Sequence, residues 1–146
     1  MLNGQNVEEA IRTAEVNEMV SPVAAVSAVR EKLVEQQKRM GRDKRIVMDG
    51  RDIGTVVFPE ADLKLFVTAS LEVRTRRRLQ ELISKNQEAD HDQVRDNLQL
   101  RDHIDSTRSD SPLIKAADAL VLDTSDLTPD LQLEKTLMLL KERFVH

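Results

Sequence analysis

The sequence contains no cysteine, no tryptophan and no tyrosine, and only three phenylalanines among its 146 residues. Without cysteine there can be no disulfide, thiolate metal site or cysteine nucleophile, and the composition fits a reducing compartment such as the cytoplasm. The scarcity of aromatic rings removes the stacking platform on which single-stranded nucleic acids bind. A net charge of −4 also argues against a general nucleic-acid coat. We therefore expect no nucleic-acid partner and a cytoplasmic location.

Long apolar runs and glycine are scarce as well. No apolar run approaches the roughly 18 residues of a membrane-spanning helix, so we expect no membrane insertion. The three histidines are scattered, and we predict no metal site. The only glycines are Gly4, Gly41, Gly50 and Gly54. They form neither G-x-x-x-x-G-K-[ST] nor G-x-G-x-x-G, so the sequence carries no phosphate-binding glycine loop.

Short apolar runs alternate with helical patterns, which predicts an α/β fold with a parallel sheet flanked by helices. The runs, expected as strands, are residues 45–49, 63–67 and 119–123. After an irregular start with short helical pieces, a helix is expected to begin at Ser21–Pro22, a favoured N-cap followed by proline, and to end before the cluster 41–44. Further helices are expected at 70–85, at 92–107 and from 128 to the C-terminus, with loops at 50–60, 86–91 and 109–112.

The segment after the first predicted strand, residues 49–54, reads Asp-Gly-Arg-Asp-Ile-Gly. In open α/β sheets, ligands bind beyond the carboxyl ends of the strands. Two glycines let the backbone bend closely, and a guanidinium flanked by carboxylates suits a phosphorylated ligand. A tight turn with surface charges is the alternative interpretation.

The helix expected at 92–107 carries a polar row. Leu98, Arg101, Asp105 and Arg108 recur at spacings of three and four, so they share one face. Leu100 and Ile104 are expected to supply the buried face beside this row. The alternative is an ordinary surface pair between Arg101 and Asp105, worth about 0.3–0.5 kcal/mol.

The helix expected at 70–85 carries four arginines within five residues, spread around most of a helical turn. One interpretation is a basic helix paired with nearby acids such as Glu72 and Glu81. The other is a movable lid whose arginine forks close on polyphosphate. The four residues are Arg74, Arg76, Arg77 and Arg78.

Taken together, six segments resemble the bacterial cytidylate kinases, which are P-loop nucleoside monophosphate kinases. The resemblance covers essentially the whole chain in the expected order, and Asp-Gly-Arg-Asp-Ile-Gly-Thr-Val-Val-Phe-Pro at 49–59 is its most specific part. The family's first strand and glycine-rich loop with its lysine have no counterpart here. We therefore expect an N-terminally truncated member: a fragment, half of a split gene or a decayed copy. The matching segments are 11–16, 21–30, 49–59, 74–78, 101–108 and 112–125.

The resemblance implies a role for ten residues. The cytosine would be recognised by Ser21, Arg30 and Asp52. The acceptor phosphate would be held by Arg51 and Arg108, and its sugar and phosphate region would be contacted by Arg101 and Asp105. The ATP phosphates would be approached by Arg74, Arg77 and Arg78, with residues 123–125 near the adenine. The catalytic set implied is Arg51, Arg101 and Arg108.

The implied fold is a partial P-loop kinase domain over residues 1–146. Its regions would be part of the nucleoside monophosphate-binding region at about 1–38, core at 39–68, lid at 69–92 and core again at 93–146. The implied reaction moves the γ-phosphoryl group of ATP, with Mg²⁺, to CMP or dCMP. We expect the isolated chain to be inactive without the missing P-loop segment. The alternatives are a non-catalytic CMP-binding remnant and, less favoured by charge and aromatic content, an arginine-rich RNA binder.

Overall fold

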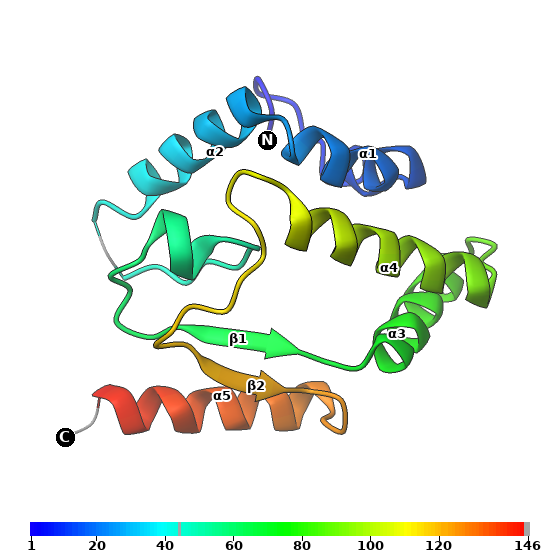
Figure 1. Ribbon diagram of the computed structural model, residues 1–146. Helices are drawn as coiled ribbons and strands as arrows, with labels where there is room; N and C mark the ends of the chain where they lie inside the picture. Colours follow the sequence, from blue (N-terminus) through cyan, green and yellow to red (C-terminus); the bar gives the residue numbers. More distant parts are fainter. Residues whose placement is uncertain (44, 145–146) are drawn as a thin grey trace.

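The computed structural model describes residues 1–43 and 45–144 (Figure 1). Lys44 of the predicted helix-ending cluster and residues 145–146 of the last predicted core region lie outside the described residues. The elements in chain order are η1 (Ala10–Arg12), α1 (Ala14–Ala24), α2 (Ser27–Met40), η2 (Ile53–Val57), β1 (Leu65–Thr68), α3 (Leu71–Ser84), α4 (His91–Thr107), β2 (Leu120–Asp123) and α5 (Pro129–Phe144).

The sheet has two parallel strands, β1 and β2, with Leu65 opposite Leu120 and Thr68 opposite Asp123. Two of the three predicted strands are therefore confirmed. The prediction of a strand at 45–49 is wrong: these residues run as irregular backbone, and the side chain of Val47 is 99% exposed. An apolar run becomes a strand only when a neighbouring strand accepts its hydrogen bonds, and none of the described residues does so for this segment.

The three later helices are confirmed to within about one residue at their beginnings, and a polar side chain caps each of them. Ser70 Oγ accepts a hydrogen bond from Val73 N at 3.3 Å at the start of α3. Asp90 caps α4 in the same way through Gln93 N, at 3.0 Å. Thr128 caps α5 through Leu131 N, at 3.3 Å. Such side chains satisfy backbone N–H groups that have no partner inside the helix.

The predicted helix start at Ser21–Pro22 is wrong. Both residues lie inside α1, which begins earlier, at a cap formed by Thr13. Proline lacks the N–H that a helix interior needs, and α1 ends two residues after Pro22, at Ala24. The chain turns at residues 25–26 and α2 begins. Ser21 therefore lies inside α1 rather than at a helix cap, and it is buried.

The predicted loop at 50–60 contains a short π-helix, η2 (Ile53–Val57). The backbone oxygen of Asp52 accepts hydrogen bonds from Val56 N at 2.9 Å and Val57 N at 3.2 Å. This turn fixes the backbone immediately after Arg51, and Val57 closes it as one of the buried apolar residues. Helix α2 packs against η2, which brings the 50–57 segment beside the first half of the chain.

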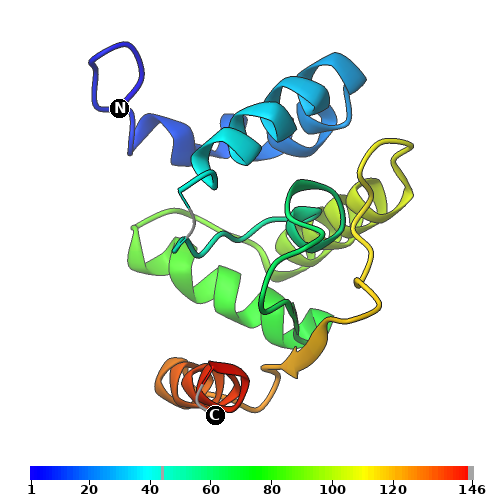
Figure 2. The same cartoon turned by 90° about the vertical axis from the view of Figure 1, so that its left-hand side faces the viewer.

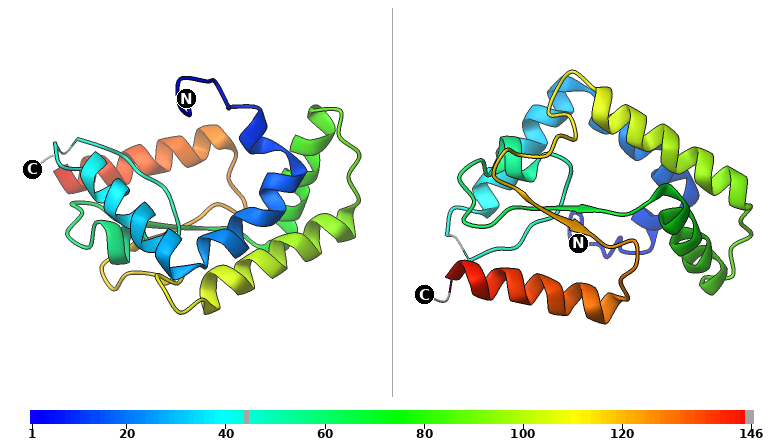
Figure 3. Two further views of the ribbon diagram at one scale, coloured as in Figure 1. Left: turned by 90° about the horizontal axis from the view of Figure 1, so that it is seen from above. Right: turned by 60° about the horizontal axis from the view of Figure 1, so that its bottom comes forward.

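The helices lie on both sides of the strands. In Figure 1, β1 and β2 lie between α5 below and the α1, α2 and α4 helices above. Figure 2 shows α5 set apart from the N-terminal helices, and Figure 3 shows α1 and α2 meeting in a bend that lies along α4. Only two apolar side chains of the described residues are fully buried, Val57 and Leu122. Within this part of the chain, no helix has both the length and the apolar character to cross a bilayer.

Candidate functional site

A pocket of about 200 Å³ lies where α1, α2, the 50–52 segment and α4 meet. It collects side chains that are up to 88 positions apart in the sequence, from Val20 to Arg108. All seven residues that the resemblance places on the acceptor side line this pocket: Ser21, Arg30, Arg51, Asp52, Arg101, Asp105 and Arg108.

One end of the pocket is an arginine cluster around a single carboxylate. Asp105 is buried, and its two oxygens are shared between two arginines. Arg51 Nε lies 2.9 Å from Asp105 Oδ2, and Arg108 Nη1 lies 3.6 Å from Asp105 Oδ1. Arg108 is fixed further by the carbonyl of Ser111, which accepts from its Nε at 2.9 Å and its Nη2 at 2.6 Å. The positive charge at this end therefore exceeds what its one carboxylate can neutralise.

Arg101 completes the cluster. Burial lowers the pKa of its guanidinium, and the nearby charge of Arg51 lowers it further, against the weaker attraction of Asp105. Its Nε is buried without a hydrogen-bond partner. A cation that is desolvated and repelled in this way is stabilised by an incoming anion, and arginine forks match the oxygens of a phosphate group.

The other end of the pocket holds a buried ion pair between α2 and the 50–52 segment. Arg30 Nη2 lies 3.5 Å from Asp52 Oδ2, and Asp52 is only 2% exposed. Arg30 Nε and Asp52 Oδ2 are both buried without a hydrogen-bond partner. Ser21, also buried, adds a hydroxyl that can donate or accept. This end therefore offers donors and acceptors to a neutral, hydrogen-bonding group.

The polar row of α4 faces the pocket, whereas the sequence predicts that the apolar residues beside it form the buried face. Leu100, expected on the buried face, is 57% exposed. Asp105 and Arg108 are buried instead, and Arg108 is the residue that ends the helix. Apolar periodicity does not predict this arrangement, because the row faces a polar pocket rather than a hydrophobic core.

The three arginines expected on the ATP side do not line this pocket. Arg77 reaches from α3 to the chain after β2, donating to Thr124 Oγ1 at 3.1 Å and to Leu127 O at 3.0 Å. Arg74 Nη1 pairs with Asp102 at 2.7 Å, and Arg78 Nη1 pairs with Glu81 at 2.8 Å. In this structure these side chains tie α3 to its neighbours and to itself.

The residues expected near the adenine, 123–125, form the turn that follows β2. Asp123 Oδ1 accepts from Ser125 N at 2.9 Å and from Ser125 Oγ at 2.7 Å. These bonds lower the pKa of the Asp123 carboxyl. Ser125 Oγ in turn accepts from Ser70 N at 3.0 Å, so the turn is joined to the cap of α3.

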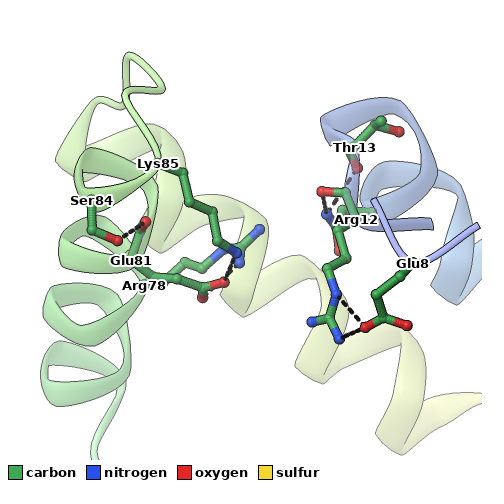
Figure 4. Close-up of polar contacts among 8 residues, drawn as sticks. Glu8, Arg12, Thr13, Arg78, Glu81, Ser84 and Lys85 are labelled. Atoms are coloured by element: carbon green, nitrogen blue, oxygen red, sulfur yellow. Dashed lines mark hydrogen bonds and ion pairs between the residues drawn. The ribbon is translucent and has the colours of Figure 1, made fainter. Parts of the chain in front are cut away.

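A second, larger pocket of about 340 Å³ lies between η1 and the C-terminal end of α3 (Figure 4). Its cations are neutralised locally: Arg12 pairs with Glu8, and Lys85 pairs with Glu81 at 2.5 Å. The pairing with Glu8 raises the pKa of Arg12. None of the buried, unpartnered polar atoms found in the described residues lines this pocket. The smaller pocket is therefore the candidate functional site.

Sequence reasoning did not select four of the residues that line the candidate site: Val20, Ala24, Gln37 and Gly50. One signal could have found Gln37. It follows Arg30 by seven residues, which is two helical turns, so the two side chains lie on the same face of α2. The three others line the pocket next to residues that were selected.

Comparison with known proteins gives the same assignment along the whole chain. The family model for cytidylate kinase matches residues 1–142. The chain belongs to the cytidylate kinase family. Among curated relatives named cytidylate kinase, that of Parabacteroides distasonis is 60% identical over 127 residues, and that of Bacteroides fragilis is 59% identical over 127 residues. Each match covers 87% of this chain and 56% of the relative.

The cytidylate kinase of Flavobacterium johnsoniae is 54% identical over 141 residues, which is 97% of this chain and 61% of that relative. The chain thus spans little more than half the length of the curated relatives that it matches. The family membership confirms the expected α/β class of fold and the resemblance on which the site residues were selected.

Proposed function

We propose that this chain provides the acceptor-nucleotide site of a kinase that transfers the γ-phosphoryl group of ATP to CMP or dCMP, giving the diphosphate. The observation that carries the proposal is the 200 Å³ pocket, which brings all seven expected acceptor-side residues together. Four arginines and two aspartates line it, a net charge of +2 in a chain whose overall charge is −4. A phosphate monoester carries about −1.5 to −2 at pH 7 and balances this charge.

At the phosphate end, we propose that Arg51, Arg101 and Arg108 hold the acceptor phosphate and act as the catalytic residues. Asp105 fixes the positions of two of these arginines before the nucleotide binds, at the distances given above. In phosphoryl transfer, an acceptor phosphate oxygen attacks the γ-phosphorus of ATP and ADP leaves. Positioned positive charge on the transferring group supplies most of the catalysis.

At the base end, we propose that Ser21, Arg30 and Asp52 recognise the cytosine. Cytosine presents an amino group as donor and two acceptors, a ring nitrogen and a carbonyl oxygen. Asp52 Oδ2, which faces Arg30 Nη2 at 3.5 Å and accepts no hydrogen bond, suits the amino group, and the unpartnered Nε of Arg30 suits an acceptor of the base. Base recognition leaves the choice between CMP and dCMP to contacts with the sugar.

On the ATP side, we propose that residues 69–92 act as a lid whose Arg74, Arg77 and Arg78 turn toward the ATP phosphates. The same proposal includes the other regions of the domain: part of the nucleoside monophosphate-binding region at about 1–38, and the core at 39–68 and 93–146. We also propose a cytoplasmic location. Mg²⁺ would accompany ATP and neutralise phosphate charge. Among residues 1–43 and 45–144, no three carboxylate or imidazole side chains converge on a metal position, so no step is derived through the ion.

The 146 residues contain no phosphate-binding glycine loop, so we further propose that a P-loop segment outside them completes the catalytic site. The chain alone would then bind CMP without phosphorylating it. Isothermal titration of the chain with CMP tests the acceptor site, and CMP binding in the micromolar to millimolar range is expected. Failure to bind CMP would contradict the proposed acceptor site.

Release of ADP in the presence of CMP, ATP and Mg²⁺ tests the catalytic part separately. We expect no turnover by the chain alone, and turnover when the part of the Bacteroides fragilis relative that this chain does not match is added in trans. Turnover by the 146-residue chain alone would show that no further P-loop segment is needed.

A further inference from the structure

Four buried side-chain atoms of the described residues have no hydrogen-bond partner, and all four belong to residues that line the candidate site. Buried polar atoms are nearly always paired in folded proteins, because an unpaired one retains its full desolvation cost. Their concentration in one pocket indicates that a ligand supplies the missing partners. The atoms are Arg30 Nε, Gln37 Oε1, Asp52 Oδ2 and Arg101 Nε.

Three of these atoms belong to residues that the proposed function already uses, and the fourth belongs to Gln37, which has no role in it. Gln37 lies on α2 two turns after Arg30, on the same face of the helix, and both residues line the pocket. Its amide oxygen is covered, although the residue as a whole is only half-buried. The neighbouring Gln36 is exposed and does not line the pocket.

We propose that Gln37 is a further specificity-determining residue of the proposed acceptor site, whose side-chain oxygen accepts a hydrogen bond from the exocyclic amino group of cytosine. The inference rests on the proposed function. An amino group has two hydrogens, and the pocket offers two buried acceptors that receive no hydrogen bond, Gln37 Oε1 and Asp52 Oδ2, the second of which faces Arg30 Nη2 at 3.5 Å. The orphaned Arg30 Nε remains as donor to a ring acceptor of the base.

Uracil carries a carbonyl oxygen where cytosine carries the amino group. In the same position it would set an acceptor against Gln37 Oε1 and Asp52 Oδ2, so both would lose the partner that the amino group provides. The pair of acceptors therefore favours cytosine over uracil more strongly than Asp52 alone. Gln37 contributes to the choice of base and not to the binding of the phosphate.

The test is titration of the 146-residue chain with CMP and with UMP, comparing the wild type with Gln37→Met, Gln37→Glu and the control Gln36→Met. Gln37→Met keeps the length of the side chain and removes its acceptor, so the CMP Kd should rise about 3- to 10-fold while the UMP Kd changes little. Gln37→Glu keeps an acceptor oxygen and should keep the preference for CMP. Gln36→Met should bind both nucleotides as the wild type does.

A second measurement uses only the wild-type chain and does not depend on whether a variant folds. The side-chain amide NMR signals of Gln37 should shift when CMP binds and shift less when UMP binds. An unchanged CMP-to-UMP ratio in Gln37→Met, or equal losses for both nucleotides, would overturn the role of Gln37. A wild-type chain that binds neither nucleotide would instead overturn the proposed function, and this inference with it. Melting curves establish that each variant is folded.

Discussion

Arg51 and Arg108 both pair with the carboxylate of Asp105. The contribution of each arginine therefore depends on the geometry of its guanidinium group as well as on its charge. Arg108 donates its Nε and Nη2 to the carbonyl of Ser111 and directs its Nη1 toward Asp105. These contacts fix the plane of the guanidinium and leave one N–H on each Nη atom for a ligand. A lysine retains the charge but has no planar fork with which to hold two partners. Replacement of arginine by lysine therefore separates the contribution of geometry from that of charge.

We expect Arg51→Lys and Arg108→Lys to raise the CMP Kd of the chain about 10- to 100-fold, because each loses charge-assisted hydrogen bonds to phosphate. Titration calorimetry with CMP measures the effect. Arg95→Lys, an exposed position on the same helix α4, serves as the control and should bind CMP normally. Wild-type affinity in Arg51→Lys and Arg108→Lys would exclude both residues from the phosphate site.

At the residue scale, the sequence indicated which side chains lie together, but it did not predict which of them are buried. The spacing of Arg101, Asp105 and Arg108 places them on one face, the family resemblance assigns them to the site, and the structure brings them to the pocket. The same spacing predicted Leu100 as a buried residue, which is wrong. Periodicity shows which side chains share a face, but the packing partner decides which face turns inward, and that partner is distant in sequence.

Between elements, the junction of α2 with the 53–58 segment is tightly packed at Gly41. A methyl group at Gly41 would lie 2.3 Å from the Phe58 ring and 3.1 Å from Ile46 Cδ1. The position needs no unusual backbone angle, so the constraint is one of space. The absence of a side chain lets the Phe58 ring cover the end of α2.

Gly41→Ala should therefore lower the free energy of unfolding by about 1–3 kcal/mol, as overpacking in a close contact does. Urea denaturation measures the change. Gly54→Ala is the matched control, because its methyl would meet the flexible Lys64 side chain, at 3.3 Å and beyond, and should cost less. Equal stability of the two variants would show that the Phe58 ring moves freely.

The α3–α4 hairpin contains a pH-dependent contact at the start of α4. His91 Nδ1 lies 3.3 Å from Asp92 Oδ1, and its Nε2 lies 3.5 Å from Glu72 Oε1 on α3. The hydrogen bond to Asp92 raises the pKa of His91 above its ordinary 6.5, and Glu72 adds to this. Because the folded pKa is the higher one, this stabilisation is complete below about pH 6.5 and is lost as the pH rises through the raised pKa.

An NMR titration of the His91 ring should give a pKa above 6.5 in the wild type. Asp92→Asn should lower it, and Glu72→Gln should lower it less, since Asp92 is the larger cause. Glu60→Gln, which lies outside the hairpin, is the control. A wild-type pKa at or below 6.5 would contradict the contact.

A helix or strand could be predicted from the sequence when the residues that begin or end it lie within or next to the element itself. Helices α3, α4 and α5 have caps in the adjacent sequence and were predicted closely. The segment 45–49 has a strand's composition, but a strand also needs a partner, which no local pattern reveals. Pro22 was assigned to a helix start, where it is most common, whereas here it lies in the last turn of α1.

At the scale of the whole molecule, the chain exposes more surface than its mass requires. Its accessible surface is 11085 Å², whereas a compact monomer of 16.6 kDa exposes roughly 7,600 Å². The apolar part of this excess includes a stripe along α5 at spacings of four, three and four residues: Leu133, Leu137, Leu140 and Phe144. Excess surface on this scale is comparable to the area buried in obligate interfaces.

Val47→Asp tests whether this excess surface receives the proposed P-loop segment when that segment is supplied as a separate polypeptide. Val47 is 99% exposed, so the substitution should change the stability of the isolated chain by less than about 0.5 kcal/mol. If the polypeptide packs beside residues 45–49, Val47→Asp should nevertheless prevent the in-trans recovery of ADP release. Glu88→Asp, an exposed change distant from this segment in sequence, is the control. Recovery equal to wild type would place the polypeptide elsewhere.

The contacts of Arg77 limit how α3 can swing. Arg77 is bonded to Thr124, and Thr124 Oγ1 donates to Thr68 O at the end of β1, at 3.0 Å. Ser125 holds the cap of the same helix through Ser70 N. The first turns of α3 are therefore anchored to the strand ends and act as a fulcrum. If residues 69–92 move as the proposed lid, the anchored N-terminal end of α3 would stay in place and the displacement would increase toward Lys85, so residues 85–90 would travel furthest, like the free end of a lever.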